Sequence, residues 1–592
     1  MHCPDTTPRP SLYYRYRVHP AWLPPAPAQP SAQQPVPQPS PQPLPTPHPV
    51  LIAGSGPAGL VTALVLARHG VPSIIVTPDV QVGQGSRAIV FTRRTLEILQ
   101  QVGTAERMTQ HGLPWRSGHS HYRGQRVYRM DAPHDADDRF HPMLNLQQPY
   151  LEEFLLDACA ATPLIDLRWG NRVVGVAQQA DRVSVEIDTP AGPYTQDSHW
   201  LVAADGGRSP IRSALGLQME GASYEGVFVI ADIQVDLPLP TERLAFFDPA
   251  WNPGNTILMH RQPQGLWRVD YQLPPGESAE QALQPASLKA RIDAQLAMIG
   301  HAGAAWTLDW SSVYSARTLT LPDYRHGRVL FAGDAAHLLP IFGVRGANTA
   351  FQDAQSLGWH LALVVQGLAG PALLDNYSAE RVAAAREIID EAGKSTRFMA
   401  PPSRGFRLLR DAVLSLSLTE DFVRPLYHWR TSRPHAYTRS MLNSRDDDDE
   451  RFNAGPAPGA PPQNIRLGPD EFLLDHLARL APGFTLLCFT DADTAALAAA
   501  IQAVLATQRA RGLPLQVIAI GSARPVLGCD LSLADADGHV RQRYGVPASG
   551  AAYLLRPDQH VCARWLSLDA ARLQAALDTA LGLGPAVAAS PA

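Results

Sequence analysis

The stretch Val50-Leu51-Ile52-Ala53-Gly54-Ser55-Gly56-Pro57-Ala58-Gly59-Leu60 decides the fold of this chain. Its apolar start predicts a short buried strand, and residues 61–69 continue as an apolar-rich helix. Gly54 suits a tight turn, Gly56 lets the backbone approach a pyrophosphate, and Gly59 lets helix and strand pack closely. The free N–H groups and dipole of the helix then favour the diphosphate. The stretch predicts a dinucleotide site; a glycine-rich turn without a ligand is the alternative.

Composition limits the classes of protein to which the chain can belong. With 592 residues it is too long for one domain of typical size, so we expect two or three. A hydrophobic content of 45% with 18% charged residues is ordinary for a globular protein. The net charge of −5 gives no reason to expect nucleic acid or an anionic membrane as partner. No run approaches the roughly 18 apolar residues of a membrane span.

The five cysteines, Cys3, Cys159, Cys488, Cys529 and Cys562, are scattered along the chain. They form no C-x-x-C pair, and no histidine cluster has the spacing of a metal site. This pattern is typical of reduced thiols rather than of a disulfide framework or a zinc site. We therefore expect no metal and a cytoplasmic protein.

Two stretches differ in composition from the rest of the chain. Sixteen of the 54 prolines lie in residues 1–50, so we expect residues 1–48 to form a disordered extension that packs on nothing. Residues 444–463 combine an acidic run with Pro, Gly and Ala, and they predict a linker. This linker separates a large unit from a C-terminal unit of residues 464–592.

A second cluster is Trp200-Leu201-Val202-Ala203-Ala204-Asp205-Gly206-Gly207-Arg208-Ser209-Pro210-Ile211-Arg212. An apolar strand is expected to end at Asp205-Gly206. A carboxylate there can accept bonds from ribose hydroxyls or hold an arginine, and Arg208 and Arg212 can neutralise phosphate. An ordinary strand-to-helix turn is the alternative interpretation.

A third cluster runs from Gly327 to His337 and on through Pro340-Ile341-Phe342-Gly343-Val344-Arg345-Gly346-Ala347-Asn348. A buried strand is expected to deliver Asp334, which is suited to polyol hydroxyls. A long helix begins near Ala347, and its positive end suits negative charge on a reduced flavin. His337 is a candidate base, although we favour a histidine that holds the turn by hydrogen bonds.

The three clusters, in this order, resemble the single-component FAD-dependent aromatic hydroxylases, the flavoprotein monooxygenase family of p-hydroxybenzoate and phenol hydroxylases. The resemblance covers about residues 49–400 and is strongest to the 3-(3-hydroxyphenyl)propionate hydroxylase branch. It implies cofactor-binding roles for Gly54, Gly56, Ala58, Gly59, Thr77, Arg87 (in Ser86-Arg87-Ala88), Gln148, Asp205, Gly206, Arg212, Gly333, Asp334, Gly343, Gly346, Ala347 and Asn348. Tyr377-Ser378-Ala379-Glu380-Arg381 is similar to the helix that closes the FAD domain.

The resemblance also implies the domain architecture. The fold class is α/β: a Rossmann-like FAD-binding domain over residues 49–400, with an antiparallel substrate-binding sheet at about residues 223–315 inserted. We expect the strands of this sheet at residues 228–235, 243–247, 255–260 and 267–272. A helical connection over residues 401–443 follows. The C-terminal unit resembles the thioredoxin-like domain of phenol hydroxylases, in a structural role because Cys488 lacks a partner.

The activity that the resemblance implies is hydroxylation of a phenolic compound. NADH or NADPH reduces FAD, O2 gives a flavin hydroperoxide, and one oxygen atom passes to the aromatic ring. Pro340 and residues 343–346 are expected to border the isoalloxazine ring, and a homodimer is one assembly to consider. Two alternatives stay open, an FAD-dependent oxidoreductase that inserts no oxygen and a non-catalytic FAD-binding protein.

The chain departs from the usual pattern at the end of the second strand. An acidic residue about 20 residues past the glycines normally binds the ribose hydroxyls, and this position falls on Thr77. A neutral hydroxyl makes a weaker hydrogen bond than a carboxylate does. Asp79 is two residues further on, after Pro78. We therefore expect weaker ribose binding than usual, with Asp79 as a partial substitute at best.

Overall fold

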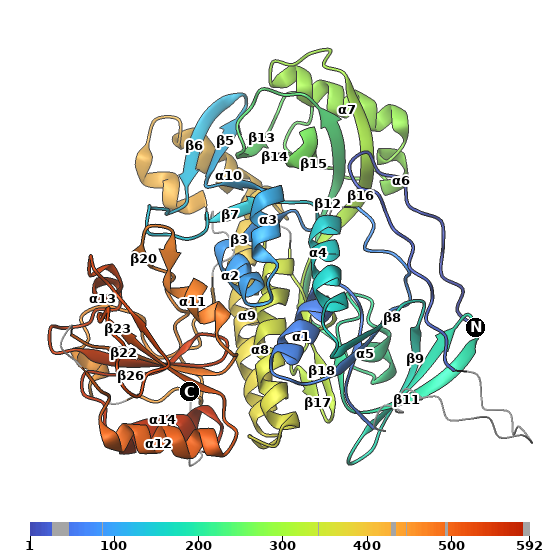
Figure 1. Cartoon of the computed structure of the whole chain (residues 1–592). Coiled ribbons are helices and arrows are strands. Elements are labelled where there is room, and N and C mark those ends of the chain that lie inside the picture. The colour runs from blue at the N-terminus through green and yellow to red at the C-terminus, as the bar shows by residue number, and fades with distance from the viewer. Residues whose placement is uncertain are drawn as a thin grey trace, which may run out of the picture.

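The computed structural model describes residues 1–25, 47–85, 87–340, 342–427, 434–445, 447–491 and 495–583 (Figure 1). Ser86, Ile341 and Asp446 of the sequence motifs, and residues 26–46 of the proline-rich extension, lie outside the described residues. Among the described residues, no helix is long and apolar enough to span a membrane.

The first sheet has β1 (His48–Ala53) at its centre, as the opening motif predicts. β1 pairs in parallel with β2 (Ser73–Val76) on one side and with β11 (Gly192–Ala203) on the other. β8 (Ile165–Arg168) continues the parallel sheet beyond β2, and β18 (Val329–Phe331) continues it beyond β11. The residues of β1 form an unbroken apolar run because both faces of a parallel sheet are buried.

β11 has two partners along its length. Its first half pairs antiparallel with β10 (Val183–Thr189), which in turn pairs with β9 (Arg172–Gln178). Its second half joins the parallel sheet and ends one residue before Ala204-Asp205. The predicted strand before the second motif is therefore confirmed, and it delivers Asp205 beside the carboxyl end of β1.

Helices cover this sheet and close the domain. α1 (Pro57–Arg68) packs on α8 (Gly346–Val365), and at their crossing a side chain on Gly358 would overlap Val65. α8 is buried over nearly its whole length, and polar side chains among its buried residues, such as Asp353, pair with neighbouring elements. α9 (Leu373–Met399) contains the predicted closing helix, and α4 (Gln148–Ala160) lies on the other side of α1.

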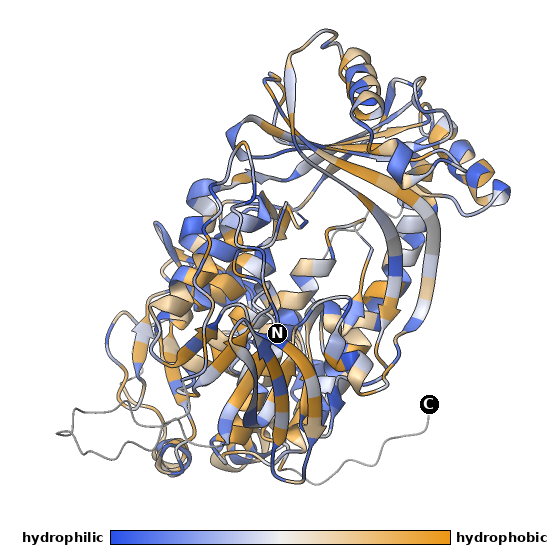
Figure 2. Cartoon of the chain, turned by 90° about the vertical axis from the view of Figure 1, so that its right-hand side faces the viewer, coloured by the Kyte–Doolittle hydropathy of each residue, from blue (hydrophilic) through white to orange (hydrophobic). Residues whose placement is uncertain are grey.

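The second sheet stands above the first in Figure 2, and α7 (Pro285–Met298) covers its outer face. Its strand order is β19-β16-β12-β15-β14-β13-β5-β6. The strands are β5 (Ser117–Tyr122), β6 (Gln125–Asp131), β12 (Glu220–Val235), β13 (Arg243–Phe247), β14 (Thr256–Arg261), β15 (Leu266–Gln272), β16 (Trp306–Thr320) and β19 (His337–Leu338). All four predicted strands form within it. The sheet also recruits β5, β6 and β19, from outside the expected range of residues 223–315.

The C-terminal unit is built on a five-stranded sheet of order β24-β23-β22-β25-β26. β22 (Phe484–Phe489) and β23 (Leu515–Ile520) pair in parallel at its centre. The other members are β24 (Leu531–Leu533), β25 (Ala551–Leu555) and β26 (Val561–Trp565). α12 (Ala499–Ala510) and α14 (Ala570–Ala580) pack against each other and against this sheet.

The remaining elements are short or connect these units. They are β3 (Val90–Thr92), α2 (Arg93–Gln101), α3 (Ala105–His111), β4 (Leu113–Trp115), β7 (Met143–Asn145), α5 (Pro210–Ala214), η1 (Pro263–Gly265), α6 (Ala279–Ala282), β17 (Arg325–His326), η2 (Gly333–Ala335), α10 (Arg404–Leu416), η3 (Asp421–Tyr427), η4 (Asp449–Arg451), β20 (Arg466–Gly468), β21 (Glu471–Phe472), α11 (Leu473–Arg479) and α13 (His539–Arg543).

The C-terminal unit is fastened to the FAD domain by buried charges. Arg556 contacts Glu380 of α9 at 2.6 Å and Asp558 at 2.6 Å, and all three side chains are at most 3% exposed. The Trp359 indole of α8 donates to Asp558 at 3.1 Å. The two units therefore share a polar interface that excludes water.

The predicted linker at residues 444–463 is packed rather than free. Asp448 accepts hydrogen bonds from the backbone of Leu566 and Ser567, and Asp449 pairs with Arg564 of β26 at 2.7 Å. The acidic residues are partnered by arginines of the C-terminal unit, a relationship that composition does not reveal. The segment belongs to that unit.

The expectation of a disordered extension is wrong for residues 1–25. Tyr14 and Tyr16 are buried at 7% and 6% exposure within the core of the FAD domain. The Trp22 backbone N–H donates to the Trp169 carbonyl at 2.9 Å, and the His19 ring stacks on Trp169. Aromatic residues between the prolines supply the apolar surface that the composition of the segment as a whole conceals.

Candidate functional site

The glycine-rich turn between β1 and α1 has an open side. A side chain on Gly54, whose φ is +108°, would overlap the Ala204 carbonyl oxygen, and one on Gly59 would overlap the Gly54 carbonyl oxygen. At Gly56, by contrast, an added Cβ would meet no atom within 4 Å. The geometry agrees with the roles expected for Gly54 and Gly59. It also leaves space at Gly56, at the N-terminus of α1, where a pyrophosphate would lie.

The third motif lies directly against this turn. Gly333 begins η2 with φ +61°, and a Cβ there would lie 3.0 Å from the Cβ of Ala58 and 3.4 Å from that of Ala350. Glycine is therefore favoured at this position, because a side chain would be crowded by the starts of α1 and α8 and would need an uncommon backbone conformation. Two motifs that are about 275 residues apart in the sequence become one site.

Asp334 is the acidic side chain that this turn presents. Solvent reaches the carboxylate, although protein surrounds it closely. Those surroundings raise the pKa of Asp334 above its usual value, while His337 and Arg87 oppose the rise. A carboxylate that solvent can reach but that protein closely surrounds is suited to accept hydrogen bonds from the hydroxyls of a ligand.

His337 does not face this opening. Its side chain is fully buried, and Nε2 lies 2.6 Å from Asp353 of α8. The other Asp353 oxygen accepts from Arg381 of α9 at 2.6 Å, and the Gly333 N–H donates to Asp353 at 3.0 Å. Burial alone would raise the pKa of Asp353, but Arg381 and His337 hold it below its usual value. His337 thus holds the turn, which is the role favoured over that of a base.

Arg212 ties two of the motifs together. Its guanidinium donates to the Gly207 carbonyl at 2.7 Å and to the Ala335 carbonyl at 3.0 Å. The side chain that was expected to neutralise phosphate is therefore bonded to backbone of its own turn and of η2. Arg208 is exposed.

Only one of the two carboxylate oxygens of Asp205 accepts a hydrogen bond from the described residues. Oδ2 accepts from the Ile211 N–H at 3.2 Å, whereas Oδ1 is buried without a hydrogen-bond partner among the described residues. Burial raises the pKa of Asp205. Such an orphaned acceptor beside Gly206 is what a hydroxyl or a cationic group of a ligand would satisfy.

The described residues 83–85 and 87–88, here called the flavin loop, are held by hydrogen bonds to α4. The Gly83 N–H donates to Glu152 at 2.6 Å, and the Ala88 N–H donates to the Gln148 amide oxygen at 2.9 Å. Gln148 in turn donates to Glu152 at 2.6 Å. The exposed side chain of Arg87 lies close enough to Asp334 to affect its charge. Gln148 therefore places the loop.

The segment from Pro340 to Asn348 forms the N-terminal approach to α8. Pro340 and Gly343 are buried, Gly346 begins α8, and Val344 adopts φ +56°, which is uncommon for a β-branched residue. The Asn348 side chain donates to the carbonyls of Val90 and Val344 and accepts from Thr92 and Thr95. Asn348 is therefore a structural link, whereas Ala347 beside it is only partly buried.

At the end of β2 the structure separates Thr77 from Asp79. Thr77 is 2% exposed, and its backbone bonds to Arg168 and Asn171. Asp79 is exposed. The turn at Pro78 thus prevents Asp79 from continuing β2.

The second sheet turns a charged row toward the FAD domain, and sequence reasoning missed it. Across the strands, Arg243, His260, Arg268 and Asp232 are direct neighbours, and all are at most 5% exposed. Arg268 forms a two-pronged pair with Asp232 at 2.8 and 2.9 Å and also reaches the Arg87 carbonyl at 3.2 Å. The signal that could have found the row is charge at alternate positions of apolar strands, as in Arg268-Val269-Asp270.

Nδ1 of His260 and Oδ1 of Asp270 are among the buried atoms of this region that lack a hydrogen-bond partner within the described residues. Burial and the two neighbouring arginines, Arg243 and Arg268, lower the pKa of His260 well below its usual value, and burial raises the pKa of Asp270 to about 7. A polar ligand group would satisfy both atoms.

The residues described here fit FAD. Space at Gly56, the orphaned Oδ1 of Asp205 and the exposed carboxylate of Asp334 follow the carboxyl ends of β1, β11 and β18, three neighbouring parallel strands, and so lie at one edge of the first sheet. A diphosphate would lie at Gly56, and the polyol would lie at Asp334.

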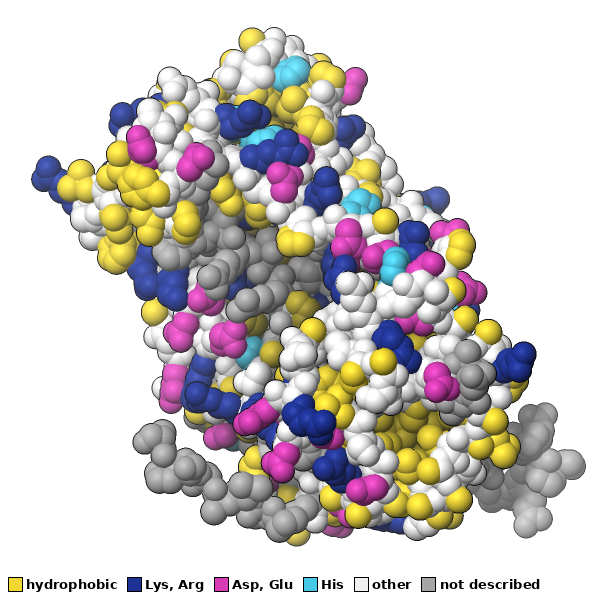
Figure 3. Space-filling view, turned by 90° about the vertical axis from the view of Figure 1, so that its left-hand side faces the viewer, with side chains coloured by type: hydrophobic (Ala, Val, Ile, Leu, Met, Phe, Trp, Pro, Cys, Tyr) yellow, Lys and Arg dark blue, Asp and Glu magenta, His cyan; other side chains and the backbone are white. Residues whose placement is uncertain are grey.

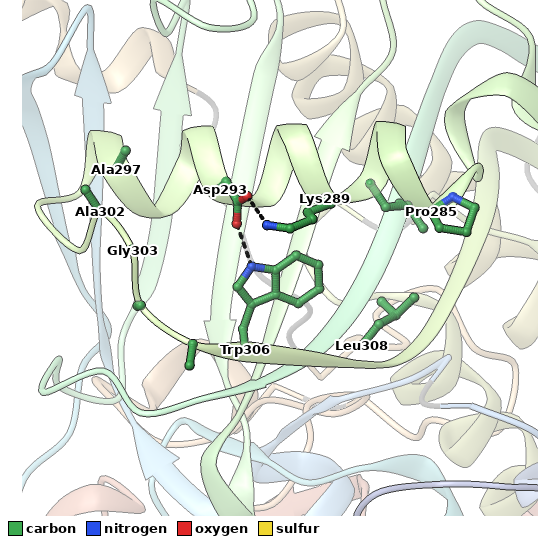
Figure 4. A pocket seen from close by; sticks show the side chains of 11 residues that line it. Pro285, Lys289, Asp293, Ala297, Ala302, Gly303, Trp306 and Leu308 are labelled. Atoms are coloured by element: carbon green, nitrogen blue, oxygen red, sulfur yellow. Dashed lines mark hydrogen bonds and ion pairs between the residues drawn. The ribbon is translucent and has the colours of Figure 1, made fainter.

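A separate groove of about 710 Å³ lies between α7 and the start of β16 (Figure 4). Asp293 pairs there with Lys289 at 2.5 Å and accepts from the Trp306 indole at 2.8 Å. Its charged groups are therefore satisfied by each other. It lies on the α7 side of the sheet, away from the flavin loop, and is not part of the site.

Comparison with known proteins places the chain in a family. Residues 48–392 match the family model described as FAD binding domain, which is more than half of the chain. The chain belongs to this family of FAD-binding flavoproteins.

The named relatives agree with the resemblance that the motifs carry, which is confirmed. The chain is 28% identical over 452 residues to the 3-(3-hydroxy-phenyl)propionate/3-hydroxycinnamic acid hydroxylase of Mycolicibacterium smegmatis, covering 75% of this chain and 77% of the relative. It is 31% identical over 366 residues to the protein of the same name from Escherichia coli O139:H28, covering 62% and 64%.

A solved structure shares the fold. The flavin-dependent monooxygenase PieE, crystallised with FAD and substrate, aligns with a TM-score of 0.74 and 24% identity. The alignment covers 90% of this chain and 99% of PieE. The described architecture is therefore that of this flavoprotein over most of its length.

Proposed function

We propose that this chain is an FAD-dependent monooxygenase that hydroxylates a phenolic aromatic compound with NADH or NADPH and O2. The observation that carries the proposal is the convergence of three distant motifs, at Gly56, Asp205 and Asp334, beneath a sheet with a charged inner face. The hydroxylases among its relatives support the same activity.

FAD, when bound, would accept a hydride from NAD(P)H and then activate O2. In our proposal the chain positions it: Gly54, Gly56 and Gly59 shape the diphosphate site, and Asp334 binds the polyol hydroxyls. Pro340 and Gly343 to Ala347 border the ring system, where backbone rather than side chains leaves room for the reactants. The N-terminus of α8 at Gly346 favours negative charge on the reduced ring.

The proposed substrate is a phenolic acid similar to 3-(3-hydroxyphenyl)propionate, the substrate named for the relatives. The charged row supports this choice, because a buried surface with arginines and a histidine suits a substrate that carries both a phenol and a carboxylate. The apolar residues around the row exclude water from the reacting atoms.

The test is oxygen incorporation. Purified protein with FAD is given NADH or NADPH, ¹⁸O₂ and a panel of phenolic acids, and mass spectrometry follows the products. A hydroxylase adds one ¹⁸O atom to the ring and consumes NAD(P)H in proportion. Oxidised product without ¹⁸O supports an oxidoreductase that inserts no oxygen. Bound FAD that NAD(P)H does not reduce, with any substrate, supports a non-catalytic protein.

We further infer that the C-terminal unit is thioredoxin-like and structural. Its support is the sheet, in which β22 and β23 are parallel and β25 and β26 antiparallel to their neighbours, flanked by α12 and α14. Burial raises the pKa of Cys488 well above its usual value, which disfavours thiolate chemistry. The five free cysteines are consistent with a cytoplasmic location.

A further inference from the structure

The N-terminal arm, residues 1–25, wraps around the edge of the cofactor site. In Figure 1 it rises from the N-terminus toward β16 and returns beside α4. At its far point, Ser11 donates to Asp309 of β16 at 2.9 Å. On both passes it bonds to the segment before the flavin loop: Gln81 donates to the Thr7 carbonyl at 2.7 Å, and the His19 N–H donates to the Val80 carbonyl at 2.8 Å.

One hydroxyl of the arm reaches the flavin loop itself. Tyr16 donates to the Gly83 carbonyl at 3.3 Å and accepts from the Gly85 N–H at 3.1 Å. The Tyr16 side chain is buried, so water does not replace these bonds when the hydroxyl is lost. The Tyr16 hydroxyl therefore satisfies one backbone carbonyl and one backbone N–H of the loop, as a paired strand would do.

The loop has little freedom elsewhere. Glu152 holds Gly83 from the inner side, and a side chain on Gly85 would overlap the Trp310 ring. Arg268 bonds to the Arg87 carbonyl at the other end of the loop. Tyr16 thus completes a set of contacts that fixes where Arg87 lies relative to Asp334.

We propose that Tyr16 is a positioning residue for the cofactor site, and that the N-terminal arm is a built-in part of this site rather than a dispensable extension. The inference rests on the proposed function only in taking FAD as the ligand. When the arm is in place, the flavin loop is held in the conformation that binds FAD. When the hydroxyl is absent, the loop samples other conformations and FAD is released more readily.

The test compares Tyr16→Phe with Tyr14→Phe, measured as the dissociation constant of FAD by fluorescence titration of the apoprotein. Tyr14 is equally buried in the same arm, but its hydroxyl interacts with Glu153 of α4 and not with the flavin loop. We expect Tyr16→Phe to raise the dissociation constant about fivefold and to alter the visible spectrum of bound flavin. We expect Tyr14→Phe to do neither, at a similar melting temperature.

The outcomes separate this proposal from the proposed function. Equal dissociation constants for Tyr16→Phe and the natural protein overturn the proposed role of Tyr16. Equal weakening of FAD binding by Tyr14→Phe also overturns it, because that result indicates a general effect of arm stability. If Tyr16→Phe does not fold, removal of residues 1–23 repeats the measurement. Failure of hydroxylation with intact FAD binding contradicts the proposed function and leaves the role of Tyr16 standing.

A different observation carries a second inference, about α10 and the segment after it. Fifteen large apolar side chains are exposed among the described residues, and seven of them lie within residues 406–426. These seven are Phe406, Leu408, Leu409, Leu416, Leu418, Phe422 and Leu426. Figure 3, viewed from the side on which α10 lies in Figure 1, shows hydrophobic side chains gathered at the upper left. Such a concentration is typical of an interaction surface.

The charges at the two ends of α10 indicate the partner. Arg404 and Arg407 are exposed in its first turn, and Glu420 and Asp421 are exposed just after its last turn. Both placements oppose the dipole of the helix itself, since anions are stabilised at the N-terminus and cations at the C-terminus. An antiparallel copy of the same helix would bring acidic residues to the basic end, and basic residues to the acidic end.

We infer that α10 pairs with α10 of a second copy of this chain about a two-fold axis near Ala412. This exposed alanine lies midway between Leu408 and Leu416, so each leucine meets the other in the partner and the small residue allows a close crossing. The inner face of α10, with Val413 and Leu414, belongs to the same buried cluster as Phe342, which precedes α8 beside the proposed cofactor site. The dimer would therefore support one wall of that site.

The mass in solution tests this directly. Sedimentation of the full chain at micromolar concentration should give twice 64.2 kDa, and Leu408→Glu with Leu409→Glu should give the single mass. Leu527→Glu, at an equally exposed leucine of the C-terminal unit, should leave the dimer intact. With Cys3→Ser in place, A412C should form a disulfide across the two-fold axis and L527C should not. A monomeric mass together with no disulfide in A412C overturns the inference. So does a monomer that binds anionic lipid vesicles through α10.

Discussion

The guanidinium of Arg212 donates a hydrogen bond of 3.0 Å to the Ala335 carbonyl, although the two residues belong to different motifs. The same side chain donates to Gly207 at 2.7 Å. One residue thus sets the distance between the turn after β11 and the turn at η2, which are the two turns that carry Asp205 and Asp334.

Replacing Arg212 with Met should weaken FAD binding about tenfold. Each hydrogen bond lost from a charged donor costs about 1.5–3 kcal/mol at most. Part of this free energy is lost from the stability of the protein rather than from the binding of FAD. Titration of the apoprotein with FAD measures the effect. Arg208→Met is the control, because Arg208 is exposed and should leave the dissociation constant unchanged. A larger effect of Arg208→Met would mean that phosphate neutralisation dominates.

Asp334→Ala should lower the affinity for FAD through loss of a charged acceptor, by about 1.5–3 kcal/mol. Asp334→Asn keeps the shape and one acceptor oxygen, so it should lie between the alanine variant and the natural protein. Flavin retained after extensive dialysis gives the ranking. Full retention by Asp334→Ala would place the polyol elsewhere.

The turn glycines should separate folding from binding. Gly56→Val faces open space, so the protein should fold with its usual melting temperature while FAD no longer fits. Gly59→Val overlaps the Gly54 carbonyl and should destabilise the protein itself. Circular dichroism and flavin content, measured on both variants, should divide in this way. A Gly56→Val protein that purifies with its flavin contradicts the placement of the diphosphate.

Asp270 should make stability depend on pH. Its pKa in the folded protein is raised to about 7 by burial, above the unfolded value of about 3.8, so the folded state holds the proton more tightly. This contribution to stability is fully present below about pH 4 and is lost as the pH rises through 7. The melting temperature of Asp270→Asn minus that of the natural protein should therefore increase as the pH rises from 5 to 8. A constant difference across this range would show that Asp270 does not titrate there.

Arg556→Met should destabilise the protein by about 3–5 kcal/mol, because it leaves Glu380 and Asp558 buried without their partner. Thermal unfolding measures the loss. Adding Glu380→Gln to Arg556→Met should cost less than the sum of the single changes, since the charges have each other as partners. Strict additivity would indicate that Arg556 acts through packing alone.

Local patterns in the sequence were enough for much of the fold. The β1–α1 turn requires glycine at fixed positions, although α1 begins at Pro57, four residues before its expected start. The strands expected at residues 243–247, 255–260 and 267–272 form within one residue of those bounds. The three motifs follow the neighbouring parallel strands β1, β11 and β18, so the sheet brings them to one edge. What the pattern did not give is that Asn348 and Arg212 bond to the protein itself, whereas the role of His337 in holding the turn is the one favoured from the sequence.

The errors have a common physical origin. Composition describes a segment as an average, whereas packing depends on single residues. Tyr16 and Trp22 fix an arm that is otherwise proline-rich, and Asp448 fixes a segment that reads as a linker. Likewise, Asp232, His260 and Arg268 lie in three different strands that are mostly apolar, and only the register of the sheet shows that they are neighbours.

Glu380 and Arg381 are consecutive residues of α9 that bind in opposite directions. Glu380 pairs with Arg556 of the C-terminal unit, and Arg381 pairs with Asp353, which holds His337 and the Gly333 N–H. The peptide bond between Glu380 and Arg381 thus connects the C-terminal unit with the turn that presents Asp334. The C-terminal unit and the turn that presents Asp334 should therefore unfold in a single cooperative transition. In a thermal scan, release of the flavin and melting of the C-terminal sheet would occur at one temperature, and a ligand that binds at either end would raise it.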